Sequence, residues 1–176
     1  MMRFSLLTLF VFLFFSLPAF AISFDIWETG MARQEIFSLA QRYDLPLAKK
    51  SLHHISKGFN SKFLVGEASQ YYYRTRLLDH PARICLLLSP AKAGYGQFLY
   101  EIEVTFTDIR KNRDLAPYVL DMLREKYGRP SRDTNIVQQF YIWHPEPSSE
   151  VRLISGSTTL QIKYTDLKIQ AFARKL

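Results

Sequence analysis

The sequence predicts an α+β domain in which an antiparallel β-sheet packs against two main helices. Two segments have the spacing of amphipathic helices, and several short runs of alternating apolar and polar residues lie between and after them. Helices and strands do not alternate one by one along the chain, and this order disfavours a parallel sheet. The same order admits two helix-plus-hairpin halves, residues 29–107 and 114–164.

The two main helices are predicted from apolar side chains that recur at i, i+3, i+4 and i+7. The first is expected over residues 29–44, with Thr29 as its N-cap. The second is expected over residues 114–128, where Asp114 can cap the N-terminus and Gly128 can end the helix in a left-handed conformation. Its predicted buried stripe consists of Leu115, Tyr118, Val119, Met122 and Leu123.

Weaker helical patterns occur at two other places. A short helix is expected before Gly58, which would end it. The C-terminal residues 166–176, DLKIQAFARKL, are expected to form a helix rather than an extended edge strand.

Strands are predicted where the apolar period changes to two. Residues 70–78 and 82–89 are expected to pair through the tight connection 79–81, and three more strands are expected at 136–143, 151–154 and 159–164. The clearest alternation begins at residue 98. There Phe98, Tyr100, Ile102, Val104 and Phe106 are expected to face the core, and Leu99, Glu101, Glu103, Thr105 and Thr107 to face water. One buried and one wet face is typical of an antiparallel sheet.

The N-terminus has the pattern of a secretory signal peptide. Arg3 precedes an apolar run over residues 4–17, and the run is followed by Pro18 and an A-x-A sequence. The run has about 14 residues, fewer than the roughly 20 that span a bilayer. We therefore expect residues 1–21 to be removed and residues 22–176 to form a single periplasmic or secreted domain. An uncleaved membrane anchor is the alternative.

Export and charge together narrow the class of partner. The mature chain keeps 22 Lys and Arg (the 23 of the full sequence less Arg3) against 16 Asp and Glu, a net charge of +6. In an exported protein this balance does not point to nucleic acid. It favours an envelope protein or an anionic envelope component, such as lipid headgroups or acidic glycans. A surface charge that only aids solubility is the alternative.

A second pattern resembles known families. The run Leu-Arg-Glu-Lys-Tyr-Gly-Arg-Pro at 123–130, then Trp143, then Leu-Gln-Ile-Lys-Tyr-Thr-Asp at 160–166, resembles uncharacterised exported bacterial proteins. The opening Gly30-Met31 and a helix with Glu35 are similar to small envelope domains of the SmpA/OmlA (BamE-like) outer-membrane assembly lipoproteins. This resemblance implies an envelope module that binds or scaffolds, with no catalytic residues to transfer. The chain departs from the lipoprotein pattern because it has no lipid-attachment cysteine after residue 21.

Catalytic and metal chemistry find little support in the residue pattern. The histidines His53, His54, His80 and His144 have no H-x-x-x-H or H-E-x-x-H spacing, so no metal site is expected. Cys85 is the only cysteine and lies in an apolar run, where it behaves as a small hydrophobe. The chain has neither G-x-S-x-G nor a phosphate-cradling glycine loop, and no cofactor is expected.

One carboxylate pair keeps an enzymatic alternative open. Glu101 and Glu103 are expected on one face of a strand, about 7 Å apart, a separation compatible with glycan hydrolysis. We expect instead that they form cross-strand charge pairs with Arg74 or Arg76.

The remaining feature is the association of aromatic with basic residues. Aromatic rings beside cations suit sugar stacking or protein recognition. The candidate binding residues are Tyr72, Arg74, Arg76, Tyr141, Trp143 and Lys163. In the run QYYYRTR at 70–76, strand alternation places Tyr71 and Tyr73 toward the core and Arg74 and Arg76 toward water.

These observations favour a non-catalytic binding or assembly module of the cell envelope. Two alternatives remain open at this stage. The first is an envelope enzyme of the glycan-hydrolase kind that uses the carboxylates or the histidines, and the second is an inhibitor or interaction domain that uses an exposed sheet face. The sequence leaves the ligand and the oligomeric state undetermined.

Overall fold

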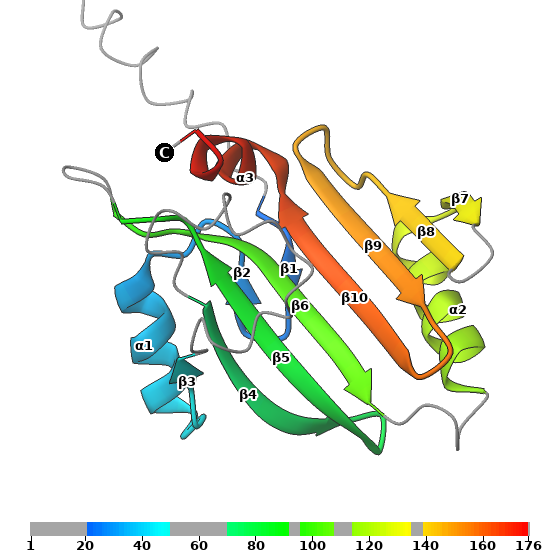
Figure 1. The fold of residues 1–176 in the computed structure, drawn as a ribbon, viewed down its shortest axis with the longest axis horizontal. Coiled ribbons are helices and arrows are strands. Elements are labelled where there is room, and N and C mark those ends of the chain that lie inside the picture. The colour runs from blue at the N-terminus through cyan, green and yellow to red at the C-terminus, as the bar shows by residue number, and fades with distance from the viewer. Residues whose placement is uncertain (1–20, 50–69, 92–95, 108–113, 135–138, 176) are drawn as a thin grey trace, which may run out of the picture.

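The computed structural model describes residues 21–49, 70–91, 96–107, 114–134 and 139–175 (Figure 1). The expected signal peptide, apart from Ala21, and the short helix expected before Gly58 lie outside these ranges. None of the helices within them is long and apolar enough to cross a membrane.

The fold is an antiparallel sheet with the strand order β3-β4-β5-β6-β10-β9-β8-β7 (Figure 1). Its strands are β3 (Ala48–Lys49), β4 (Gln70–Leu77), β5 (His80–Leu88), β6 (Leu99–Thr107), β7 (Ser131–Thr134), β8 (Gln139–Trp143), β9 (Ser149–Ser155) and β10 (Thr159–Asp166). A separate hairpin pairs β1 (Ser23–Phe24) with β2 (Trp27–Glu28). The helices are α1 (Arg33–Arg42), α2 (Leu115–Tyr127) and α3 (Leu167–Ala173). The predicted α+β class with an antiparallel sheet is confirmed, and α3 is the helix expected at the C-terminus.

The sheet consists of two halves that follow one another in the sequence. The first runs α1-β3-β4-β5-β6 and the second α2-β7-β8-β9-β10, so a helix precedes four successive antiparallel strands in each. Each half is therefore a helix followed by a four-stranded meander, which is one strand more than the three predicted in each half and more than the helix-plus-hairpin unit that the order of elements admitted. The halves join where β6 pairs with β10, in a register that runs from Thr107 opposite Thr159 to Glu101 opposite Thr165.

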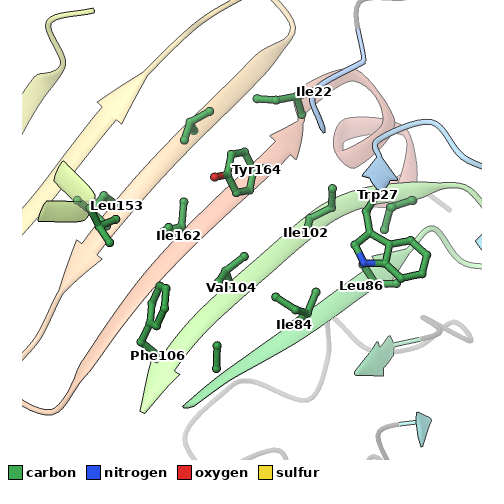
Figure 2. Packing of buried hydrophobic residues seen from close by; sticks show 14 of the residues in the cluster. Ile22, Trp27, Ile84, Leu86, Ile102, Val104, Phe106, Leu153, Ile162 and Tyr164 are labelled. Atoms are coloured by element: carbon green, nitrogen blue, oxygen red, sulfur yellow. The ribbon is translucent and has the colours of Figure 1, made fainter. Parts of the chain in front are cut away.

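One face of the sheet, here called the core face, carries the hydrophobic core (Figure 2). Strand alternation places Tyr71 and Tyr73 of β4 on it, as predicted, and both are buried. The same core includes buried residues of α1, α2 and the β1–β2 hairpin, so these elements cover this face. Trp27 is fully buried there, and its Nε1 donates a hydrogen bond to the Tyr73 hydroxyl at 2.8 Å.

A β-bulge breaks the predicted alternation at the start of β6. Leu87 lies opposite Glu101 but Leu88 lies opposite Leu99, so Tyr100 is an extra residue on the β6 side. An extra residue shifts the inward period by one. Leu99 is accordingly fully buried, whereas Phe98 is 37% exposed. The predicted inward row is therefore wrong for Phe98, which precedes the bulge. It is confirmed for the residues that follow the bulge, Ile102, Val104 and Phe106.

The helix ends differ from prediction in two respects. Thr29 does not cap α1; its Oγ1 accepts a hydrogen bond from the Ile22 amide, and α1 begins at Arg33, where the Glu35 carboxylate accepts a hydrogen bond from the Ala32 amide. Asp114 occupies the N-cap position of α2 but makes no side-chain capping hydrogen bond.

The predicted stripe of α2 is only partly buried. Leu115, Val119 and Leu123 face the core, but Tyr118 and Met122 are exposed, which corrects the prediction for those two residues. The buried positions follow a strict i, i+4, i+8 spacing, so the side of the helix that faces the sheet is narrower than the apolar pattern indicated.

The turn between β4 and β5 is tighter than expected. It consists of Leu78 and Asp79, with φ values of 50° and 61°, while His80 and Pro81 already belong to β5. Positive φ at both central positions is the geometry of a type I′ turn, which favours Asn-Gly. A leucine in this conformation is sterically disfavoured.

We predict that the double substitution Leu78→Asn, Asp79→Gly stabilises the domain by about 1 kcal/mol, because these residues adopt positive φ at lower cost. Chemical denaturation of the two proteins would measure the gain. The Asp79 carbonyl, which accepts a hydrogen bond from the Arg76 guanidinium, is retained in this variant. A loss of stability would show that the Leu78 side chain contributes packing that outweighs its backbone strain.

Candidate binding site on the outer face of the sheet

The sheet face opposite the core face, here called the outer face, carries most of the polar strand residues. Its central row follows the register from Tyr72 to Cys85, Glu103, Lys163 and Arg152, each directly opposite the next on β4, β5, β6, β10 and β9. The α1 and α2 residues of the core lie on the other side of these strands. In Figure 1 the sheet is seen from this face, with α2 behind β8 and β9.

Lys163 lies between two glutamates at the centre of the outer face. Its Nζ is 3.4 Å from Glu101 Oε1 and 3.4 Å from Glu103 Oε2. Thr165 Oγ1 donates to the second oxygen of Glu101 at 3.4 Å, and Thr105 Oγ1 donates to Glu103 at 3.0 Å. The glutamates meet Lys163 rather than Arg74 or Arg76, which corrects the predicted charge pairs. The reason is the strand order, since β5 separates β4 from β6.

The neighbouring charges affect the pKa of Lys163 more strongly than its burial does. Burial alone lowers the pKa of the Lys163 ammonium, but the neighbouring Glu101 and Glu103 carboxylates raise it, and the net effect is a raised pKa. Glu101 is only 7% exposed, so one lysine balances two carboxylates in a confined polar cluster. A carboxylate pair held by a shared cation differs from a glycosidase pair, in which one carboxyl must carry a proton to donate.

Alkaline pH is expected to destabilise the fold. The raised pKa of Lys163 means that its stabilising charge is present below pH 10.5, the ordinary lysine value, and is lost as pH rises through the folded value. Burial also raises the pKa of Tyr73 and Tyr164, and raises that of Tyr100 to about 12. These tyrosines therefore ionise in the unfolded chain first, and stability falls as pH rises above 10.

Denaturation midpoints measured from pH 8 to pH 11.5 would test this expectation. Tyr164→Phe should flatten the alkaline loss of stability, whereas Tyr118→Phe, at an exposed position, should leave it unchanged. Equal pH profiles for wild type and Tyr164→Phe would contradict the expectation.

A second ion pair lies beside this cluster on β9. Arg152 Nη2 is 2.8 Å from Glu150 Oε1, and Arg152 is directly opposite Lys163 in the register. Two of the cations on the outer face are thus neutralised by glutamates of the same face.

Three other arginines of the outer face lie close together without such partners. Arg74 and Arg76 extend from β4, and Arg83 of β5 lies directly opposite Arg74. Within the described ranges, no carboxylate lies within ion-pair distance of any of the three. Arg76 donates to the Asp79 carbonyl, and the buried Nε of Arg83 has no hydrogen-bond partner. We call Arg74, Arg76 and Arg83 the arginine cluster.

The structure divides the predicted binding residues between the two faces. Tyr72, Arg74, Arg76 and Lys163 lie on the outer face. Tyr141 and Trp143 are on the core face, 7% and 3% exposed, and Trp143 Nε1 donates to the Gly128 carbonyl at 2.9 Å. The six residues are therefore not brought together at one surface.

Arg83 was missed by the sequence reasoning because it borders an apolar run. Alternation from Ile84, whose apolar side chain is expected in the core, would have placed Arg83 on the opposite face of the strand. Cys85 itself is buried, and the Gln70 side-chain amide donates to its Sγ at 3.1 Å, consistent with an inert thiol.

Metal ligands do not converge in the part of the chain that the structure describes. No group of three His, Cys, Asp or Glu side chains there could hold a metal ion. His80 and His144 lie on different elements, β5 and the segment after β8, while His53 and His54 are outside the described residues.

Two hollows lie away from the outer-face glutamates. One of about 560 Å³ is lined by Arg124, Gly128, Arg129, Pro130 and Tyr141 at the C-terminal end of α2. Another of about 710 Å³ lies between β2 and α1, with Glu28, Gln34, Glu35 and Arg42 among its lining residues. Neither includes Glu101, Glu103 or Lys163, so neither extends the central charged cluster into a pocket.

Comparisons with known proteins gave no relatives. No family model matches the chain, and neither the curated proteins nor the solved structures contain a match.

Proposed function

We propose that this chain is a non-catalytic binding or assembly module of the bacterial cell envelope, exported by its N-terminal segment. In this proposal it binds an envelope protein or an anionic envelope component through the outer face of its sheet. The observation that carries the proposal is the arginine cluster. It places three like charges together on a sheet face whose other described cations, Lys163 and Arg152, have glutamate partners. Uncompensated charge of this kind attracts a complementary surface.

The envelope location is part of the proposal and depends on the signal-peptide pattern at residues 1–21. The resemblance to exported bacterial proteins and to the SmpA/OmlA (BamE-like) domains supports the same location and a scaffolding role. An inhibitor that acts through a sheet face would use the same surface. The glycan-hydrolase alternative is weakened because Lys163 already pairs with both candidate carboxylates.

Site-specific photo-crosslinking in intact cells would test the proposal. A photoreactive phenylalanine analogue at Tyr72 reports on the outer face, and the same analogue at Tyr118, exposed on α2, serves as the matched control. We expect a discrete adduct from position 72, identified by mass spectrometry as an envelope component, and none from position 118. Absence of any adduct from position 72, or the same adducts from both positions, would reject the outer face as the binding surface.

A further inference from the structure

The arginine cluster places like charges unusually close together. Arg74 and Arg83 are directly opposite in the antiparallel β4–β5 pair, and Arg76 follows two residues along the same face. Side chains in this relation start from Cβ atoms only about 5 Å apart, and like charges so placed are destabilising. The fold thus keeps an unfavourable arrangement at this corner of the sheet.

A purely structural role does not explain the three charges. Arginine stems can cover apolar surface, but a neutral glutamine would cover it without repulsion. Elsewhere on the same face the described cations have counter-charges, with Lys163 between Glu101 and Glu103 and Arg152 beside Glu150. The arginine cluster differs in having no carboxylate partner within the described ranges.

The chemistry of the cluster selects an oxyanion partner. The guanidinium group is planar and donates paired hydrogen bonds that match a carboxylate or a phosphate. Tyr72 lies on the same face two residues before Arg74, and Leu78, 40% exposed, occupies the strained turn beyond Arg76. Arginine and tyrosine are among the residues enriched in the energetic centres of protein interfaces.

The surroundings of the cluster favour a protein over a lipid surface. Asp79 lies at the tip of the same hairpin. On the neighbouring strand β6, Glu103 is two residues from the position directly opposite Arg83, on the same face of the sheet. A uniformly anionic membrane would meet these carboxylates unfavourably, whereas a protein surface of alternating charge can complement them.

We infer that the arginine cluster, with Tyr72 and Leu78 at its edges, is the docking site for an acidic protein segment, whose carboxylates accept hydrogen bonds from Arg74, Arg76 and Arg83. This inference rests on the proposed function, because it names the chemistry of the partner that the outer face binds.

Binding of defined probes tests the inference directly. The mature protein would be titrated with a fluorescein-labelled oligoglutamate peptide, with inorganic phosphate, and with phosphatidylglycerol vesicles. The cluster variant Arg74→Gln, Arg76→Gln, Arg83→Gln would be compared with a control, Arg42→Gln, Arg129→Gln, Lys168→Gln, which removes the same charge from exposed positions on other elements.

We expect the peptide to bind wild type and control within twofold of each other, with an affinity that falls as salt rises, and the cluster variant to bind at least tenfold more weakly. An equal loss of peptide affinity in the cluster variant and the control variant would show that only the net charge of the protein matters, and would overturn the inference. Binding of vesicles or phosphate, but not of the peptide, lost only in the cluster variant, would overturn it in favour of a lipid or phosphate ligand.

A stability measurement gives a readout that needs no ligand. Arg83→Gln should raise the melting temperature by about 1–3 °C at low salt, because it removes one of two like charges that lie directly opposite each other. The gain should vanish at high salt, which screens the repulsion. A lower melting temperature at both salt concentrations would show that Arg83 serves the fold, and would count against the inference. A Tyr72 crosslink to a non-acidic protein would overturn the acidic partner while leaving the proposed function standing.

Discussion

Replacing Trp27 with alanine is expected to lower the free energy of unfolding by about 4 kcal/mol or more, the largest effect anticipated for a single substitution in this chain. The indole is fully buried in the core, so its removal leaves a large cavity. It also leaves the Tyr73 hydroxyl without the donor that it now accepts from, in a buried position. Denaturant unfolding followed by circular dichroism would measure the change.

Two further variants separate the cavity from the hydrogen bond. Trp27→Phe retains most of the volume but leaves the Tyr73 oxygen unpaired, and Tyr73→Phe added to it removes that unpaired group. The double variant should therefore be no less stable than Trp27→Phe alone. A loss of less than about 1 kcal/mol for Trp27→Ala would contradict the placement of the β1–β2 hairpin in the core.

Replacing Lys163 with methionine is expected to cost about 2–4 kcal/mol, although methionine is more apolar than lysine. The substitution leaves Glu101 and Glu103 side by side without the cation that both now contact at 3.4 Å. Glu101 is nearly buried, so water cannot fully compensate the two negative charges. Thermal and urea unfolding at neutral pH would measure the loss.

The matched variants for Lys163 test whether charge is the cause. Glu101→Gln, Glu103→Gln and Lys163→Met combined should recover most of the stability, because removing a whole buried charge group is far less costly than removing one member. Lys168→Met, an exposed lysine of α3, should have no effect within 0.5 kcal/mol. If the combined variant is no more stable than Lys163→Met, the loss arises from packing rather than from unpaired charge.

Strand positions and faces were predictable wherever the local pattern alone decides them. The period of two in QYYYRTR placed Tyr71 and Tyr73 inward and Arg74 and Arg76 outward, and the structure confirms this. The pattern failed at Phe98, because the bulge beside Leu88 depends on how β5 and β6 pair and leaves no local mark in the sequence.

The composition of the outer face was less predictable, because it depends on strand order. Glu103 meets Lys163 since β10 lies beside β6, although 60 residues separate the two in the sequence. Trp143 was a reasonable surface candidate beside Tyr141 and His144, but the α2 helix covers that side of β8. Aromatic residues suit both cores and binding surfaces, so residue type alone could not decide between them.

The join between β6 and β10 has a consequence for how the chain reaches its folded state. Among the residues that the structure describes, both outer edges of the sheet are short, with two residues in β3 and four in β7, and short edges resist pairing with other molecules. The first half alone would instead end in β6, a nine-residue strand with an open row of backbone donors and acceptors. Because β10 follows α2, β7, β8 and β9 in the sequence, this long edge stays unpaired until all of these elements have been synthesised. The interval before the two halves meet is therefore the stage at which the protein is most exposed to aggregation.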